Sequence, residues 1–357
     1  MTFLIAAAGT GGHVFPGLSV AEALIDLGVP RSDVLFVGGS RLEAQVYPGE
    51  GFRFLQIELR GLQRSLSLQN ITLPWVVVKA RRRIQKAIEE SRVRAVLGMG
   101  GYVTVPAGLA ARRTQVPFLN SEQNAEAGLA NRLMARWAIR SFTSFPETVG
   151  LPDAEWVGNP VREPFWSFDR TTLHRDAIAR FGLRTDSPVL GVFGGSLGAG
   201  VLNEAALTLA REGVGRPLQI LHLTGDQHLN SIRAAIPAED IRWTRIGFEE
   251  SMEMFYAACD LVLARAGGAV AELTATGTPS ILVPGEFGST GHQKGNARYL
   301  TRAGAAITLP EAELARLGEV ITGCLFDSGQ LEAMRTAATL IARPDAARAV
   351  ARAMMEA

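Results

Sequence analysis

Short apolar runs of strand length alternate along this chain with longer stretches of helical period, and this alternation limits the possible folds more than any other feature. Runs typical of buried strands occupy residues 3–8, 34–37, 95–97 and 117–119, and a second series occupies 188–193, 219–223, 261–264 and 280–283. Strands that alternate with helices predict parallel sheets covered by helices on both faces. The two series therefore predict an α/β fold with two doubly wound, Rossmann-like parallel-sheet domains.

The boundary between the two domains is predicted near residues 157–164. That segment has two prolines and a glycine and shows neither a strand nor a helix period. A length of 357 residues also fits two domains of about 150 residues each. We therefore expect domains at 1–160 and 161–342, followed by a C-terminal helix within 343–357 that packs back on the first domain.

Composition excludes several classes of protein. Only two cysteines occur, so a disulfide framework or a cysteine-rich zinc site is excluded, and a net charge of +1 gives no reason to expect a nucleic-acid partner. The apolar N-terminus lacks a basic leader and stops at Gly9, which favours a first strand over a signal peptide. No apolar run approaches the ~20 residues of a spanning helix, so we expect the chain to stay in the cytoplasm.

Positive charge is concentrated in one part of the chain. Residues 60–140 contain 14 Lys+Arg against 4 Asp+Glu, a net +10, which leaves −9 for the rest. Apolar residues run directly into basic clusters at 73–83, 112–113 and 136–140. The pattern fits either solvated helix faces or an interfacial surface that meets anionic lipid.

Four Gly-rich turns follow predicted strands and open predicted helices, at residues 9–12, 98–101, 194–199 and 265–269. Such turns expose backbone N–H groups, and the helix beyond adds a favourable dipole for a phosphate. Ligands bind at this edge of open α/β sheets. Two turns in each half predict a diphosphate site in which the turns face one another across an interdomain cleft.

Other chemistries are less well supported by the sequence. There is no Gly-Lys pair for a Walker A loop, no dinucleotide fingerprint, and no Asp-x-Asp or His-Glu-x-x-His, so neither a cofactor nor a metal is expected. One rival remains, because residues 194–198 satisfy the Gly-x-Ser-x-Gly nucleophile elbow of serine hydrolases. Ser196 would then be the nucleophile, with Asp260 and His292 following in the required order.

The ordered set of motifs resembles the MurG-type peptidoglycan N-acetylglucosaminyltransferases across nearly the whole chain. The matching residues are Ala8-Gly9-Thr10-Gly11-Gly12-His13-Val14-Phe15-Pro16-Gly17, Gly98-Met99-Gly100-Gly101-Tyr102-Val103, Glu122-Gln123-Asn124, Gly158-Asn159-Pro160-Val161-Arg162, Gly194-Gly195-Ser196-Leu197-Gly198-Ala199, and His292-Gln293 with Asn296-Ala297. The resemblance implies a GT-B fold, two Rossmann-like domains facing across a cleft. It further implies an inverting transfer of N-acetylglucosamine from UDP-N-acetylglucosamine to the C4 hydroxyl of undecaprenyl-pyrophosphoryl-N-acetylmuramyl-pentapeptide, at the cytoplasmic face of the inner membrane.

The resemblance also implies roles for individual residues. Thr10, Gly11 and Gly12 would approach the donor sugar and diphosphate, and Ser196 would hold the diphosphate. Arg162 would stabilise the departing UDP, and Glu272 would accept hydrogen bonds from the ribose hydroxyls. Asn124 and Gln293 would form hydrogen bonds with sugar hydroxyls, and His13 is the candidate base. Two departures stand out: Ser121 replaces the histidine usual before Glu-Gln-Asn, and the segment 265–272 is one residue short. A non-catalytic nucleotide-sugar-binding membrane adaptor is the third reading.

Overall fold

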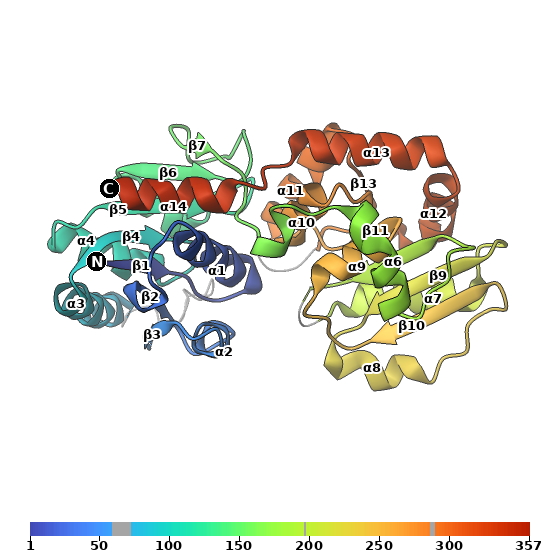
Figure 1. Cartoon of the computed structure of the whole chain (residues 1–357), viewed down its shortest axis with the longest axis horizontal. Helices are drawn as coiled ribbons and strands as arrows, with labels where there is room; N and C mark the ends of the chain where they lie inside the picture. Colours follow the sequence, from blue (N-terminus) through green and yellow to red (C-terminus); the bar gives the residue numbers. More distant parts are fainter. Residues whose placement is uncertain (59–72, 196–197, 286–289) are drawn as a thin grey trace. The chain divides into compact units, whose positions relative to one another are not determined.

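The chain divides into two compact units in the computed structural model, which describes residues 1–58, 73–195, 198–285 and 290–357 (Figure 1). Unit 1 contains Met1–Glu163 together with Arg343–Ala357, and unit 2 contains Pro164–Ala342. The division therefore falls three residues beyond the expected one at 160, and the C-terminal segment belongs to unit 1.

Unit 1 is built on a parallel sheet of seven strands within the described residues, in the order β3-β2-β1-β4-β5-β6-β7. The strands are β1 (Thr2–Ala6), β2 (Val34–Gly38), β3 (Arg53–Gln56), β4 (Val93–Gly98), β5 (Phe118–Glu122), β6 (Arg140–Thr143) and β7 (Glu155–Trp156). Chain order proceeds outward from β1 in one direction and from β4 in the other. The topological switch point of the sheet thus lies between β1 and β4.

The helices of unit 1 pack as two sets. They are α1 (Gly11–Asp26), α2 (Glu43–Gly49), α3 (Leu73–Ser91), α4 (Thr104–Arg113), α5 (Leu129–Ala135) and α14 (Ala346–Glu356). Helix α14, red in Figure 1, lies beside α1, and Arg348 of α14 forms an ion pair with Asp26 at 3.0 Å. Helix α4 packs against both α3 and α5, so these three helices form one continuous layer.

Unit 2 repeats the design with a parallel sheet of six strands in its described part, in the order β10-β9-β8-β11-β12-β13. Its elements are β8 (Val189–Phe193), β9 (Leu218–Leu223), β10 (Ile241–Ile246), β11 (Leu261–Ala264), β12 (Ser280–Leu282) and β13 (Ala306–Thr308), with α6 (Arg170–Arg180), α7 (Gly200–Glu212), α8 (Asp226–Arg233), α9 (Met252–Ala258), α10 (Ala269–Ala275), α11 (Thr290–Arg302), α12 (Leu317–Leu325) and α13 (Ser328–Ile341). Here the switch point lies between β8 and β11.

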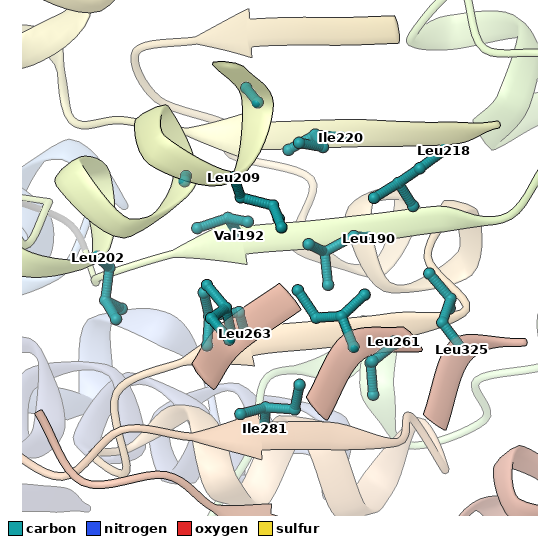
Figure 2. Close-up of a cluster of buried hydrophobic side chains, with 14 of the residues drawn as sticks. Leu190, Val192, Leu202, Leu209, Leu218, Ile220, Leu261, Leu263, Ile281 and Leu325 are labelled. Atoms are coloured by element: carbon teal, nitrogen blue, oxygen red, sulfur yellow. The ribbon is translucent and has the colours of Figure 1, made fainter. Parts of the chain in front are cut away.

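Alternate residues of the central strands build the core of unit 2 (Figure 2). Leu190 and Val192 of β8 lie on the same face of the sheet as Leu261 and Leu263 of β11, because side chains two positions apart share a face. Leucines of α7 and α12 cover this face. The cluster therefore anchors the two strands whose carboxyl ends carry the Gly-rich turns of unit 2.

The predicted fold class of two Rossmann-like parallel-sheet domains is confirmed. Several elements were missed. The strand β10 was not predicted because Arg242, Thr244 and Arg245 interrupt its apolar pattern, and β3 and β6 are short and partly polar. Helix α1 begins at Gly11, directly in the Gly-rich turn, and its first turns include Gly12 and Pro16. None of the helices in the described parts of the chain is long and apolar enough to cross a bilayer.

Candidate functional site

All four Gly-rich turns lie at the carboxyl ends of strands that flank a switch point. In unit 1 the turns at 9–12 and 98–101 follow β1 and β4, which are hydrogen-bonded neighbours. In unit 2 the turns at 194–199 and 265–268 follow β8 and β11, which are also neighbours. Parallel strands end at the same edge of a sheet, so the sequence was right to pair the turns within each half. The switch point of an open α/β sheet is the place where such folds bind ligands.

The first turn places the predicted contact residues at the start of α1. Gly9 has φ +110°, and extended Thr10 is the N-cap, with its carbonyl accepting the His13 and Val14 N–H groups at 3.0 and 3.1 Å. Gly11 and Gly12 are the first two helical residues. Early N–H groups of a helix have no partner within the helix and favour an anion. The turn therefore has the geometry of an anion-binding N-terminus.

His13 packs directly on the second turn. A Cβ atom added to Gly100 would lie 2.8 Å from His13 Cδ2 and 2.9 Å from its Nε2, and one added to Gly101 would lie 2.6 Å from the Ala8 carbonyl oxygen. Both glycines also have positive φ, +91° and +73°. The structure thus brings the candidate base and the two turns of unit 1 into one site.

A buried glutamate ties the loops of this site together. Glu43, at the start of α2, is fully buried, and its Oε1 accepts the Gly39 N–H at 2.9 Å and the Tyr102 hydroxyl at 3.2 Å. Its Oε2 accepts the Gly9 N–H at 3.2 Å. Burial, together with the Glu43 carboxylate, raises the pKa of Tyr102 to about 12. Glu43 was not predicted from the sequence as a site residue. The one feature that could have indicated it is its position a few residues after the glycines at the end of β2.

Asn124 belongs to a second buried network at the end of β5. Glu122 is 2% exposed, and its carboxylate accepts the Asn124 N–H and Nδ2 at 2.9 and 3.0 Å, the Gly128 N–H at 2.9 Å and the Asn131 Nδ2 at 2.8 Å. The Asn124 amide is therefore oriented by Glu122. Ser121, which stands where the resembled family usually has histidine, is buried and receives a bond from Gln123 Nε2 at 3.3 Å.

Arg162 lies in unit 1, although a boundary at 160 would have placed it in the second domain. Its guanidinium stands 5.9 Å from the centre of the Phe15 ring of α1. The pKa of nearby Glu22 is raised by burial, an effect that the charge of Arg162 partly offsets. The predicted contact is therefore held beside the helix that carries Thr10 and His13.

In unit 2 the turn after β8 is described only in part, because Ser196 and Leu197 lie outside the described residues. Gly195 and Gly198 have φ +95° and +74°. A Cβ on Gly198 would collide with the carbonyl oxygen of Thr224, so only glycine fits there. The Nδ2 of Asn203 in α7 donates to the same carbonyl at 3.0 Å, which fixes the start of that helix.

Glu272 and Gln293 both have partners inside unit 2. Glu272 lies in the first turn of α10, and its Oε2 accepts the Tyr256 hydroxyl at 2.8 Å. The Oε1 of Gln293 accepts the Gly285 N–H at 2.9 Å, so this amide would serve a ligand through its NH₂ group. The turn between β11 and α10 is braced by Asn296, whose Nδ2 donates to the Ala266 carbonyl at 3.0 Å.

The serine-hydrolase alternative is wrong. Asp260 immediately precedes β11, its N–H donates to the Val189 carbonyl at 2.9 Å, and its carboxylate pairs with Arg170 at 2.6 Å. Since β8 and β11 are parallel, Asp260 lies at their amino ends, whereas Ser196 follows the carboxyl end of β8. Four strand residues at about 3.3 Å each separate the two ends, so a triad cannot form.

The three basic and apolar clusters predicted from the sequence lie on α3, at the end of α4 and at residues 136–140, which directly follow α5. Trp75 is 79% exposed on α3, and Leu129 and Ile139 are 60% and 56% exposed. Arg112 of α4 stacks on the Trp137 ring at 4.7 Å. A groove of about 330 Å³ between α3 and α4 is lined by Arg81, Arg82, Gln85, Lys86, Glu89 and Arg113.

Comparisons with known proteins agree along the chain. Residues 3–143 match the glycosyltransferase family 28 N-terminal domain, and residues 189–350 match the glycosyltransferase family 28 C-terminal domain. A UDP-N-acetylglucosamine--N-acetylmuramyl-(pentapeptide) pyrophosphoryl-undecaprenol N-acetylglucosamine transferase of Dechloromonas aromatica is 38% identical, covering 99% of this chain and 98% of the relative. A transferase of the same description from Halorhodospira halophila is 40% identical, with 98% and 96% covered.

Solved structures show the same architecture. The crystal structure of Acinetobacter baumannii MurG covers 100% of both chains with a TM-score of 0.81 and 29% identity. A UDP-GlcNAc 2-epimerase from Neisseria meningitidis, bound to UDP-GlcNAc, covers 100% of both chains with a TM-score of 0.68. Because the epimerase is only 15% identical, it supports the fold alone.

Proposed function

The chain belongs to glycosyltransferase family 28, and from this we infer that it transfers N-acetylglucosamine from UDP-N-acetylglucosamine to undecaprenyl-pyrophosphoryl-N-acetylmuramyl-pentapeptide. One structural observation carries the inference. Each unit presents two Gly-rich turns on neighbouring strands at its switch point, which is an arrangement suited to a phosphate-bearing ligand. The full-length likeness to transferases of this description supplies the identity of the substrates. The chain is accordingly an enzyme of peptidoglycan synthesis.

The donor is assigned mainly to unit 2. The turn at 194–199, with Ser196 and the start of α7, would bind the diphosphate, and Glu272 would accept the two ribose hydroxyls. An ionised carboxylate accepts only, and charge-assisted bonds of this kind are the strong ones. Gln293 would donate its NH₂ group to a sugar hydroxyl, since its carbonyl oxygen is already bonded to Gly285.

The acceptor chemistry is assigned to unit 1. His13 would take the proton from the acceptor C4 hydroxyl as that oxygen attacks the anomeric carbon and the bond to the phosphate oxygen breaks, inverting the centre. Imidazole titrates near neutral pH, which suits a general base. Arg162 and a helix N-terminus would stabilise the charge on the departing UDP. Thr10, Gly11, Gly12 and Asn124 are proposed as further contacts of the transferred sugar.

Release of UDP that depends on the lipid acceptor tests this function. We expect UDP to be formed from UDP-N-acetylglucosamine only when the undecaprenyl-linked acceptor is present, together with the disaccharide product. Release without acceptor would indicate a hydrolase, and binding without turnover would indicate an adaptor.

Glu272→Ala tests the donor assignment. The variant should weaken UDP binding by about 30- to 150-fold, since a charge-assisted contact to two hydroxyls contributes about 2–3 kcal/mol. Glu239→Ala is the matched control, because Glu239 is an exposed carboxylate of the same unit. Equal UDP affinity of the Glu272 variant and wild type in calorimetry would remove Glu272 from the site.

The layer formed by α3, α4 and α5 is proposed to bind anionic lipid at the cytoplasmic face of the inner membrane. Exposed Trp75 stands about one helical turn from Val78 and about two turns from Arg82 and Arg83 on the same helix. Interfacial binding needs such apolar depth together with positive charge, and each basic residue contributes about 1 kcal/mol near an anionic surface. The predicted attachment is therefore peripheral and reversible.

Vesicle sedimentation tests this surface. Wild type should sediment with anionic vesicles at low salt and be released at high salt. Trp75→Ser with Arg82→Ser and Arg83→Ser should weaken sedimentation and leave UDP affinity unchanged. The triple control Arg211→Ser, Arg233→Ser and Ile236→Ser removes the same kinds of exposed side chain from unit 2. If the two triple variants lose sedimentation with anionic vesicles to the same extent, the α3–α5 layer is not the lipid-binding surface.

A further inference from the structure

Tyr256 is a fully buried tyrosine in α9 whose ring is held by aromatic side chains from three elements. The ring centre lies 5.6 Å from that of Phe255, 5.9 Å from that of Phe165 and 6.1 Å from that of Phe193, with interplanar angles of 76°, 66° and 77°. Edge-to-face packing of this kind favours one ring orientation. The aromatic packing therefore restrains the position of the phenol oxygen.

The hydroxyl of this fixed ring donates to Glu272. The distance from the phenol oxygen to Glu272 Oε2 is 2.8 Å, and the bond joins α9 to the first turn of α10. A hydrogen bond to an ionised carboxylate is stronger than one between neutral groups. The bond therefore restrains the plane of the Glu272 carboxylate as well as its rotamer.

The restrained carboxylate keeps the capacity to bind a ligand. A carboxylate has about four lone-pair sites on its two oxygens, and the bond from the Tyr256 phenol occupies one of them, on Oε2. Glu272 is half-buried, whereas Tyr256 is completely shielded from solvent, so a ligand would meet the carboxylate and not the phenol. Two vicinal hydroxyl groups can be accepted together only when the carboxylate plane is held in register with them.

The cluster also connects Glu272 to the Gly-rich turn. Phe193 is the last residue of β8, and the turn at 194–199 follows it directly. The aromatic contacts of Tyr256 therefore link the strand end that leads into the proposed diphosphate turn with the carboxylate proposed for the ribose.

We propose that Tyr256 is a positioning residue that orients Glu272 toward the two ribose hydroxyls and so makes the enzyme selective for a ribonucleoside diphosphate over its 2′-deoxy analogue. The proposal rests on the proposed role of Glu272 as the ribose acceptor. Tyr256 does not touch the nucleotide itself.

Tyr256→Phe tests the proposal, because it removes only the hydroxyl oxygen and keeps the ring. Calorimetry with UDP and with 2′-deoxy-UDP gives two dissociation constants for each variant. Tyr256→Phe should weaken UDP binding by about 5- to 10-fold and 2′-deoxy-UDP binding by no more than about 2-fold, so the preference for the ribose falls. The KM for the donor should rise in parallel, while kcat at saturating donor stays within about 2-fold of wild type.

Further variants complete the comparison. Glu272→Gln should lose the same preference, and Tyr256→Phe added to it should cause little additional loss. Tyr47→Phe is the matched control, since Tyr47 is also fully buried and donates to a backbone carbonyl, that of Val14 at 3.1 Å, but lies in unit 1. If Tyr256→Phe does not fold, Phe165→Leu replaces it, because loosening the ring should lower the same preference.

The outcomes separate this proposal from the function on which it rests. An unchanged preference in Tyr256→Phe beside a reduced one in Glu272→Gln would overturn the role of Tyr256 and leave Glu272 in place. An unchanged preference in both would remove both residues from ribose recognition while acceptor-dependent transfer stands. An equal loss of UDP affinity in Tyr47→Phe would trace the effect to general destabilisation and also overturn the proposal.

Discussion

Replacing Glu43 by glutamine tests how far one buried carboxylate organises the site in unit 1. Glutamine keeps one oxygen, which can still accept the Gly39 N–H and the Tyr102 hydroxyl. Its NH₂ group then replaces Oε2 and meets the Gly9 N–H donor to donor. Glutamine has nearly the same shape as glutamate, so the packing around the side chain is kept and only the hydrogen bonding differs.

The magnitude follows from these three bonds. One bond to a charged group is lost, at about 1.5–3 kcal/mol, and the other two weaken because their acceptor becomes neutral. When relaxation of the loops is included, we expect Glu43→Gln to lower the free energy of unfolding by about 2–4 kcal/mol. This is a large share of the ~5–15 kcal/mol that stabilises a typical domain. Solvent screening does not reduce this figure, because Glu43 is completely buried.

Hydrogen exchange followed by mass spectrometry measures the effect locally. Amides of the peptides that contain Gly9 and Gly39 should exchange about 30- to 900-fold faster in Glu43→Gln, which corresponds to 2–4 kcal/mol of opening free energy. Glu50→Gln is the control, since Glu50 is exposed at the end of the same helix. The transferase kcat should fall while UDP affinity, assigned to unit 2, is kept.

Exchange of these peptides within about threefold of wild type would refute the reasoning. The carboxylate would then be a dispensable buried group, and the loops after β1, β2 and β4 would hold their positions through backbone geometry alone. A fall in UDP affinity equal to the fall in kcat would contradict the assignment of the donor to unit 2.

Three further perturbations have defined expectations. Burial, with a smaller contribution from the charge of Arg245, lowers the pKa of His222 to about 3, so the stability supplied by neutral His222 is complete above pH 6.5 and is lost as the pH falls toward 3. The free energy of unfolding measured by urea titration should therefore fall by about 2 kcal/mol between pH 7 and pH 5. The same pH dependence in His222→Gln would contradict this. Gly198→Ala forces a Cβ against the Thr224 carbonyl at φ +74° and should weaken UDP binding at least about tenfold in calorimetry, whereas Gly200→Ala, which meets nothing within 4 Å, should not. Deletion of residues 343–357 removes the buried face of α14 from unit 1 and should make that unit sensitive to protease, while UDP binding persists. If unit 1 stays resistant to protease after the deletion, α14 is not needed for its stability.

The sequence determined the layered α/β architecture and the position of the Gly-rich turns. Both depend on local rules: a parallel strand buried on two faces needs a continuous apolar run, and a turn with positive φ needs glycine. Order along the chain also let the motifs be matched to a family, and full-length relatives confirm that match. Strands that contain charged residues, such as β10, were not predicted, because an edge strand tolerates polar side chains and so lacks a continuous apolar run.

Only the tertiary structure decided which residues meet. Glu43 lies 34 residues from Gly9 and 59 from Tyr102, and nothing in the local sequence marks them as partners. Asp260 follows Ser196 in the order of a hydrolase triad, yet the parallel register of β8 and β11 places Asp260 at the amino ends of these strands, away from the carboxyl end of β8. Hydrogen bonds and catalytic contacts depend on separations of a few ångströms, and those separations are set by strand pairing and helix packing across distant parts of the chain.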